Sequence, residues 1–454
     1  MQKKHFSLSA NPARVITGSF LGVIITGTLL LMLPLSAKNG AVTNFFDALF
    51  TATSATCVTG LIVVDTYTHW TFFGQGVILS LIQIGGLGLV TLTLFFNLLI
   101  RRKLGLRTLQ LAQESTSASN FEDTPRLLRG IVGISLIVEA IGAVLLLPAF
   151  VPKYGMEGIF ISVFTSVSAF CNAGFDLLGR EGPYSSLIHY NGSYVLLVVS
   201  ALIIIGGLGF MVLFDLLHYH KSKKLRLHSR VVLLSTACLL FIGTLGFAAL
   251  EWHNPATMGN LPVWQKLNAA FFQSVSTRTA GFNSIDIASM NEISKVLSIG
   301  LMFIGAAPGS TGGGIKVTTI VVLIMTAVSV ARGYDDTIIM KHKIKRQVVN
   351  KSLTVVFIGF LAVLLASGVI IYTTHDGGVT ASTVDALFES TSAFATVGLS
   401  SGITAIANLP SKLLLIATMF LGRIGPISFL LSLAAGSGKV NRKQVMPEGH
   451  LNVG

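Results

Sequence analysis

The sequence has few charged residues and very few cysteines, and each shortage excludes a class of protein. Charged residues make up 11% of the 454 residues and hydrophobic residues 52%, whereas an ordinary soluble domain has about 25% charged residues. The three cysteines, Cys57, Cys171 and Cys238, lack the spacing of a metal site and are expected to be small buried residues. Apolar runs of about the ~20 residues that cross a bilayer recur along the chain. The composition therefore predicts an all-α polytopic membrane protein in a lipid bilayer, without a sizeable soluble domain.

The net charge of +13 indicates membrane topology rather than a nucleic-acid partner. Most basic residues fall in five clusters, and two predicted spans separate each cluster from the next. The clusters are Lys3, Lys4 and Arg14; Arg101 to Arg107 with Arg126 and Arg129; Lys221 to Arg230; Arg332 to Lys351; and Lys439 to Lys443. Two spans return the chain to the same face, and basic loops favour the cytoplasmic side. Both termini are therefore predicted to be cytoplasmic.

A motif of fixed spacing recurs four times and divides the chain into four units. In each copy a Phe is followed ten positions later by a Gly, and Phe or Leu follows the Gly. The copies are 50–60, 164–174, 271–281 and 388–398, and three of them carry Asp47, Asn268 or Asp385 three residues before the Phe. Repetition at one spacing is the signature of an internal repeat. The predicted units are 1–110, 111–225, 226–346 and 347–454, the last with a C-terminal tail.

Each unit is expected to contain an outward span, a half-helix too short to cross, and a returning span. The expected outward spans are 14–35, 127–150, 231–250 and 353–372. The expected half-helices are 43–55, 158–169, 264–277 and 383–393, and the expected returning spans are 72–100, 194–219, 294–331 and 412–436. This pattern predicts eight transmembrane helices and four re-entrant pore half-helices, in four parallel units around one pseudo-fourfold pore.

The segment that ends at each repeated glycine has the composition of a pore lining. Non-helical backbone at membrane depth is tolerated only where it is buried in protein or lines water. Four segments around one axis can form rings of carbonyl oxygens that replace the hydration shell of a monovalent cation. A single Ser/Thr/Gly run would more simply be a helix-packing motif, but four runs at one spacing favour the pore. The predicted filter residues are Thr56, Cys57, Val58, Thr59 and Gly60; Phe170, Cys171, Asn172, Ala173 and Gly174; Thr277, Arg278, Thr279, Ala280 and Gly281; and Phe394, Ala395, Thr396, Val397 and Gly398.

These four segments resemble the filter of the Trk/Ktr/HKT superfamily of K+ transporters, most closely that of the KtrB-type membrane subunits. The resemblance covers nearly the whole chain and implies K+ at filter carbonyls near Gly60, Gly174, Gly281 and Gly398. Some plant members have Ser at the first of these positions and prefer Na+, so four glycines resemble the K+-selective type. None of the segments spells the T-V-G-Y-G of K+ channels, so selection against Na+ is expected to be less strict.

The returning spans carry small-residue patches at 84–88, 205–209, 304–309 and 421–426, which allow close helix packing or a kink. The third patch extends into a stretch, 305–316, with five Gly and one Pro, where a continuous helix is not expected. By resemblance this stretch is an intramembrane gating loop, with Gly309, Ser310, Thr311, Gly312, Gly313, Gly314 and Lys316 as gating residues. A nucleotide-binding P-loop is disfavoured because Ile315 separates Gly314 from Lys316 and no strand precedes the loop.

Two cations, Lys316 and Arg423, lie at membrane depth, and a third, Arg278, lies within the third filter segment. Lys316 either reaches towards the cytoplasm or takes part in gating. Arg423 is central in its span, so a functional role is expected. The resemblance places it in the cytoplasmic half of the pore, near the loop. Our hypothesis is that Arg423 raises an electrostatic barrier to cations while the loop is closed. Arg278 is expected to point away from the axis and to hold the filter through backbone carbonyls or through a carboxylate, the candidates being Glu389, Asp47 and Asp385.

The sequence thus predicts a K+-translocating subunit of a bacterial plasma-membrane uptake system, and not an enzyme. Paired carboxylates or metal ligands typical of a membrane enzyme are not evident, and the units are parallel rather than inverted as in many solute carriers. A Na+-permeable, HKT-like transporter is the alternative, with Na+ as a coupling or activating ion left open. The resemblance implies a homodimer and a cytosolic, nucleotide-binding (KtrA-like) regulatory ring. The basic loops at 221–230 and 332–346 either dock that ring or only set the topology.

Overall fold

The computed structural model describes residues 12–88, 124–376 and 382–434, and almost all of them lie in helices or short connections. The first group of elements comprises α1 (Pro12–Leu31), η1 (Pro34–Ser36), α2 (Phe45–Cys57), α3 (Thr66–His69) and α4 (Phe72–Leu87). The second comprises α7 (Thr124–Tyr154), α8 (Glu157–Phe170), η2 (Ile188–Tyr190), α9 (Tyr194–Leu208) and α10 (Phe210–Ser222). The third comprises α11 (Leu227–Glu251), α12 (Val263–Ser276), α13 (Glu292–Phe303) and α14 (Val317–Ala331). The fourth comprises α15 (Arg346–Asp376), α16 (Thr383–Ala395), α17 (Ile403–Ile406), α18 (Leu409–Ile424) and α19 (Pro426–Ala434).

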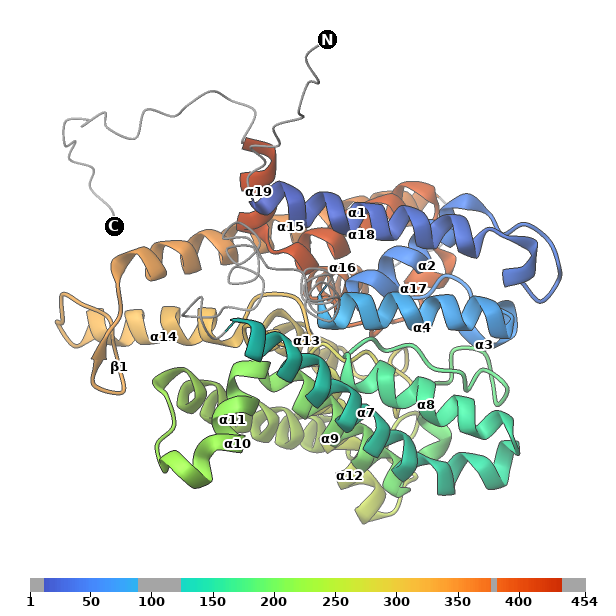
Figure 1. The fold of residues 1–454 in the computed structure, drawn as a ribbon, viewed down its shortest axis with the longest axis horizontal. Helices are drawn as coiled ribbons and strands as arrows, with labels where there is room; N and C mark the ends of the chain where they lie inside the picture. The colour runs from blue at the N-terminus through green and yellow to red at the C-terminus, as the bar shows by residue number, and fades with distance from the viewer. Residues whose placement is uncertain (1–11, 89–123, 377–381, 435–454) are drawn as a thin grey trace, which may run out of the picture.

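A two-stranded hairpin, which the all-α prediction missed, joins the third and fourth groups. Strand β1 (Ile338–Ile339) pairs antiparallel with β2 (His342–Lys343). The hairpin lies at one end of the molecule and α3 at the other (Figure 1), and these ends are called the hairpin end and the α3 end below. Such a short hairpin leaves no periodic signal in the sequence.

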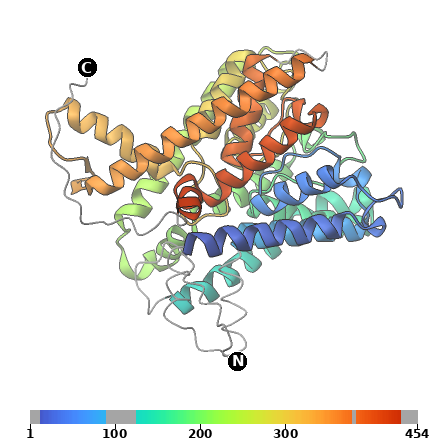
Figure 2. The same cartoon turned by 90° about the horizontal axis from the view of Figure 1, so that it is seen from above.

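The short helices close a cycle through the four groups. Each packs against the long helix before it, in the pairs α1–α2, α7–α8, α11–α12 and α15–α16. Each also packs against a helix of the preceding group, in the pairs α8–α4, α12–α9, α16–α13 and α2–α18. The last pair joins the fourth group to the first. Helix α19 contacts both α1 and α15 and lies between them (Figure 2).

Within the described residues, four helices are long and apolar enough to cross a membrane: Arg14–Leu31, Leu128–Tyr154, Leu227–Glu251 and Arg346–Thr374. They match the four predicted outward spans. Their outer faces are apolar, with Phe357 69% exposed and Phe241 65% exposed, whereas α2 buries hydroxyls such as Thr53 and Ser54. Exposed apolar and buried polar side chains are what a bilayer selects for.

The second and fourth returning spans are not the continuous helices that the sequence predicted, and residues 89–100 of the first lie outside the described residues. Helix α4 ends at Gly88 (φ 82°), α9 at Gly209 (φ 87°) and α18 at Gly425 (φ 90°). At Gly209 the chain turns by 98° into α10, and only this bent pair makes a fifth candidate span among the described residues. A positive φ is readily adopted by Gly, so the glycines break the helix. The expected interruption within 304–316 is present, because α13 ends at Phe303 and α14 begins at Val317.

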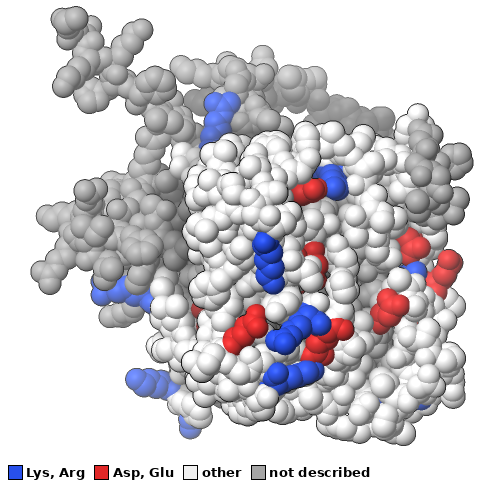
Figure 3. All heavy atoms as spheres, turned by 90° about the vertical axis from the view of Figure 1, so that its right-hand side faces the viewer, with Lys and Arg blue, Asp and Glu red and all other residues white. Residues whose placement is uncertain are grey.

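Charge is distributed unevenly between the two ends. The connections α10–α11 and α14–α15, which carry the basic clusters 221–230 and 332–351, lie at the hairpin end (Figure 1). At the α3 end, Lys and Arg lie beside Asp and Glu (Figure 3), as in the pairs Lys153–Glu181 and Arg180–Glu157. The clusters at Lys3–Lys4, 101–107 and 439–443 lie outside the described residues. Cys57 and Cys171 are buried, but Cys238 is exposed on α11, contrary to the prediction.

Candidate functional site

The four predicted filter segments share an unusual backbone conformation near their ends. Their first residues are helical and not extended as predicted, because the short helices continue through Thr56, Cys57, Phe170, Phe394 and Ala395. Each repeated glycine has a positive φ: 93° at Gly60, 70° at Gly174, 79° at Gly281 and 96° at Gly398. The residue two positions earlier is also left-handed, with φ 57° at Val58, 59° at Asn172, 69° at Thr279 and 52° at Thr396. Of these four, only Asn commonly adopts this conformation, and it is an outlier for the β-branched residues. Strain of this kind persists only where the surroundings enforce it, and it concentrates at functional sites.

The four glycines form a closed ring. A Cβ on Gly60 would lie 2.6 Å from the carbonyl oxygen of Ala173 and 3.0 Å from the Cα of Gly174. A Cβ on Gly174 would lie 2.9 Å from both the carbonyl oxygen of Ala280 and the Cα of Gly281. A Cβ on Gly281 would collide with the carbonyl oxygen of Val397, and one on Gly398 with that of Thr59. Each segment therefore approaches the next so closely that only glycine fits, and the fourth meets the first.

Backbone and serine contacts hold the segments in place. In the first segment Thr59 N donates to Ser54 O at 2.8 Å and Gly60 N to Ser54 Oγ at 3.1 Å. In the fourth segment Val397 N and Gly398 N make the same two bonds to Ser392, at 2.8 and 3.1 Å. These bonds orient the amides toward the short helix, which leaves the carbonyls free to face elsewhere.

The small-residue patches pack directly against these segments. A Cβ on Gly85, Gly206 or Gly422 would collide with the carbonyl oxygen of Thr56, Phe170 or Phe394, respectively. Close packing, the expected role of the patch in the second unit, therefore occurs, and a kink occurs as well, three residues further on. Gly206 packs on the second segment and Gly209 bends the helix.

The Gly-rich connection 304–316 lies against the same segments. Thr311 Oγ1 donates to Phe170 O at 3.1 Å, and Thr311 N donates to Gly206 O at 3.3 Å. A Cβ on Gly312 or Gly313 would collide with Oγ1 of Thr279 or Thr396. The connection therefore contacts the second, third and fourth filter segments.

Two of the three predicted cations bind this connection. Arg423 donates to Thr311 O and to Gly85 O, and its Nη2 lies 3.5 Å from Gly86 O. Lys316 Nζ donates to Gly312 O at 2.7 Å and lies 3.3 Å from Gly313 O. Lys316 therefore folds back onto the connection instead of extending away from it. Arg423 joins the connection to α4 of the first group.

The third cation, Arg278, uses a carbonyl and not a carboxylate. Its Nη1 lies 3.5 Å from Thr236 O on α11. The three proposed carboxylate partners are engaged elsewhere: Glu389 accepts from Ser400, Ser401 and Thr404, Asp47 pairs with Lys412, and Asp385 pairs with Lys295. Sequence reasoning missed both lysines. A signal existed, because Lys295 and Lys412 each lie ten residues before a patch glycine, Gly305 and Gly422.

A cavity of about 220 Å³ opens in front of the glycine ring on the α3 end. All four ring glycines line it, together with Asp65, Asp176 and Asp286. Burial, followed by the nearby charge of Asp65, raises the pKa of Asp176 to about 6. Asp65 accepts from the amides of Tyr67, Thr68 and Tyr184 and so ties two loops together. The cavity presents negative charge to anything that approaches the ring, and sequence reasoning had not singled out Asp176 or Asp286.

A membrane-embedded ring of four similar segments, backed by a Gly-rich connection, is the architecture of a transport protein. The model of the TrkH family, described as a cation transport protein, matches residues 3–443, and the chain belongs to this family. This membership confirms the predicted resemblance to the Trk/Ktr superfamily, and it identifies a transporter rather than an enzyme.

Named relatives agree with this membership. The chain is similar to the Ktr system potassium uptake protein B of Bacillus subtilis (strain 168), at 40% identity over 93% of each chain. It is also similar to the potassium/sodium uptake protein NtpJ of Enterococcus hirae, at 36% identity over 100% of each chain. Among solved structures, the potassium transporter TrkH from Vibrio parahaemolyticus has a TM-score of 0.69 at 20% identity, covering 95% of this chain and 86% of that one. This last likeness concerns the fold alone.

Proposed function

We propose that this chain is the K+-translocating subunit of a K+ uptake system, with the glycine ring as its selectivity filter. The observation that carries the proposal is the closed ring of Gly60, Gly174, Gly281 and Gly398, in which every member has a positive φ. The names of the relatives, potassium uptake protein B and potassium/sodium uptake protein, support K+ as the cargo.

Selectivity would come from backbone carbonyls. Each segment has two left-handed residues, the glycine and the residue two positions before it. They let successive carbonyls turn toward one side of the segment. Four such segments would surround a dehydrated K+ with carbonyl oxygen atoms. The predicted filter residues, from Thr56 to Gly60 and in the three equivalent segments, are the residues that we assign to this role. Because their side chains differ among the four units, discrimination against Na+ would be weaker than in a symmetric channel.

The Gly-rich connection would act as the gate. It lies directly against the filter segments, and Arg423 and Lys316 both bind its carbonyls. Arg423 would hold the connection closed and would place a positive charge in the path of the cation. Movement of the connection away from α18 would break the contact between Arg423 and Thr311 and open the path.

The remaining features of the proposal concern the assembly. Four parallel span–half-helix–span units would surround one pore in the bacterial plasma membrane, with the basic hairpin end in the cytoplasm. The subunit would form a homodimer and bind a cytosolic, nucleotide-binding (KtrA-like) ring. The exposed hairpin and the connection α10–α11 offer basic residues for that contact.

A Na+-permeable transporter is the second candidate. The name of the relative NtpJ includes both potassium and sodium uptake, and the four filter segments differ in sequence. The two candidates make different predictions about competition between ions.

Uptake of radioactive Rb+ into proteoliposomes that contain only this protein separates the candidates. Strong inhibition by K+ and little by Na+ would support the K+-selective filter. Equal inhibition by both ions would favour the Na+-permeable alternative. If no uptake occurs, addition of the cytosolic partner tests whether a closed gate is the cause, and continued absence of uptake would refute both candidates.

A further inference from the structure

A carboxylate lies buried behind the second filter segment. Glu139 is on α7 and only 5% exposed. Its Oε1 and Oε2 accept from Gln83 Nε2 on α4, at 3.1 and 3.2 Å. The thiol of Cys171, at the start of the second segment, lies 3.9 Å from Glu139 Oε1 and 3.8 Å from Gln83 Oε1. In the part of the chain that the structure describes, no Lys or Arg forms an ion pair with Glu139.

Fold stability alone does not explain an acid at this place. A buried acid without a cationic partner is costly, and an apolar residue of similar size would usually be less so. Helix capping does not account for it either. Gln83 is near the C-terminal end of α4, and Cys171 immediately follows the C-terminal end of α8. The C-terminus of a helix carries partial negative charge, so a carboxylate there is disfavoured.

The second segment lacks the serine contact that holds two of the others. Ser54 and Ser392, six residues before their ring glycines, accept from Gly60 N and Gly398 N through Oγ. Ser168 is the equivalent residue before Gly174, but its Oγ has no partner among the described residues. The second segment keeps the backbone bond from Ala173 N to Ser168 O at 2.7 Å, and Glu139 and Gln83 add a contact at Cys171, three residues before Gly174.

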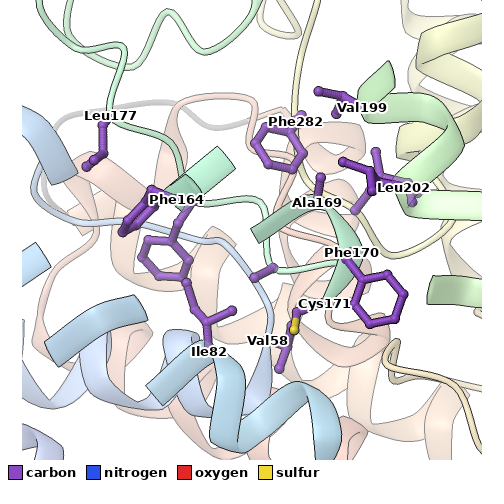
Figure 4. Close-up of a cluster of buried hydrophobic side chains, with 14 of the residues drawn as sticks. Val58, Ile82, Phe164, Ala169, Phe170, Cys171, Leu177, Val199, Leu202 and Phe282 are labelled. Carbon is purple, nitrogen blue, oxygen red and sulfur yellow. The ribbon is translucent and has the colours of Figure 1, made fainter. Parts of the chain in front are cut away.

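Cys171 connects this cluster to the neighbouring filter segments. A Cβ on Gly86 would lie 2.6 Å from Cys171 Sγ, so α4 confines the thiol from one side. Figure 4 shows Cys171 beside Val58 of the first segment. The next residue, Asn172, has φ 59°, and its side-chain amide lies 3.2 Å from Thr279 Oγ1 of the third segment. A shift of Cys171 would therefore disturb three segments of the ring.

From this arrangement we infer that Glu139 is a positioning residue that sets ion specificity, acting through Gln83 and Cys171 on the second filter segment. The inference rests on the proposed function, because it assigns a role within that filter. Glu139 would fix the position of Cys171 and hence the left-handed turn at Asn172. Without it the ring would relax and distinguish K+ from Na+ less well.

The substitution Glu139→Gln tests the inference because it keeps the shape of the side chain and replaces the carboxyl group that contacts Gln83 and Cys171 with an amide. Two readouts on the purified full-length protein are compared: thermal stabilisation by K+ relative to Na+, and inhibition of Rb+ uptake by the two ions. We expect the preference for K+ to fall about fivefold in both, as for the loss of one ordinary hydrogen bond. Unchanged preference in Glu139→Gln would overturn the inference.

Glu251→Gln is the matched control. Glu251 is a second buried acid, and it accepts from Asn254, Thr257 and Asn291, none of which is a filter residue. The Glu251→Gln variant should have a lower melting temperature than the unaltered protein but the same preference for K+. If both variants lose preference equally, Glu139 has only a structural role.

An exchange of the two groups keeps the test valid if Glu139→Gln folds poorly. In the double variant Gln83→Glu with Glu139→Gln, the same carboxylate–amide pair faces Cys171 from the opposite helix. We expect the exchange to restore the preference for K+ that Glu139→Gln loses, and failure to restore it in a folded protein would contradict the inference. If the unaltered protein itself shows no preference for K+, the proposed function fails, and this result is distinguishable from failure of the Glu139 role.

Discussion

The carboxylate of Asp47 lies 2.8 Å from the Nζ of Lys412, which is 365 residues further along the chain. The same relationship joins Asp385 to Lys295, also at 2.8 Å. In both pairs the acid lies in the first turn of a short helix and the lysine on the packed helix of the preceding group. The two pairs fasten the junctions between groups four and one and between groups three and four.

We expect Asp47→Asn to destabilise the protein by about 1–3 kcal/mol, between the values for exposed and fully buried pairs. The substitution removes the charged partner of Lys412 at the contact between α2 and α18. Thermal unfolding in detergent measures the effect, and the exchange Asp47→Lys with Lys412→Asp should recover part of it.

Lys343→Ala provides the control for this pair. Its partner Asp336 is 48% exposed and Lys343 itself 70% exposed, so the loss should be below about 1 kcal/mol. Equal losses for Asp47→Asn and Lys343→Ala would show that the junction pair is no stronger than a surface pair.

Gly281→Ser should lower the preference for K+ over Na+ by about fivefold, equivalent to ~1 kcal/mol. The new Cβ would collide with Val397 O and would force the third and fourth segments apart. Competition of K+ and Na+ against Rb+ uptake is the measurement.

Gly300→Ser serves as the reference for this change, because nothing lies within 4 Å of a Cβ at that position of α13. It should leave ion preference intact. A preference in Gly281→Ser as high as in the unaltered protein would mean that the ring does not select the ion.

Arg423→Ala should raise uptake by the isolated subunit about tenfold, because it removes the contacts to Thr311 and Gly85 and a charge worth several kcal/mol in a low-dielectric site. Arg423→Lys separates the two effects. Lysine keeps the charge but cannot form the forked contact to two carbonyls. If flux and its regulation are the same in all three proteins, Arg423 has no part in gating.

The protein should become less stable as the pH drops below about 6.5, because burial of His69 disfavours its protonation in the folded state. Burial lowers the pKa of His69 from its usual 6.5, opposed in part by Asp47. Below that value the unfolded chain takes up a proton that the folded protein resists, so stability is present above the unfolded pKa and is lost as the pH falls. In His69→Gln the melting temperature should depend less on pH between 7 and 5.5. An equally steep dependence in that variant would assign the effect to other groups, and His342→Gln in the exposed hairpin is the matched control.

The sequence predicted the parts of the fold that repeat. The four short helices begin and end within two residues of their predicted limits, because a fixed distance from Phe to Gly marked them. The approach of the four ring glycines is consistent with the predicted arrangement of four segments around one axis, because each glycine has the same place in its copy of the motif. The assignment of these residues to K+ selection remains a prediction.

Features that depend on tertiary contact were not predictable in the same way. Valine rarely adopts a left-handed backbone conformation, so the sequence did not predict the positive φ of Val58. The bend at Gly209 could have been either close packing or a kink, and only the neighbouring helices decide between them. Lys295 and Lys412 show no local pattern with their partners, since each pair joins different groups.

The cycle of helix contacts has a consequence for how the protein is made. The first short helix, α2, emerges early in synthesis, but the helix that completes its surroundings, α18, is among the last. Contacts between residues so distant in sequence form slowly, because the chain between them must first be confined. The first filter segment therefore reaches its final surroundings only after nearly the whole chain has been synthesised. A chain truncated before α18 would leave α2 without its contact to that helix.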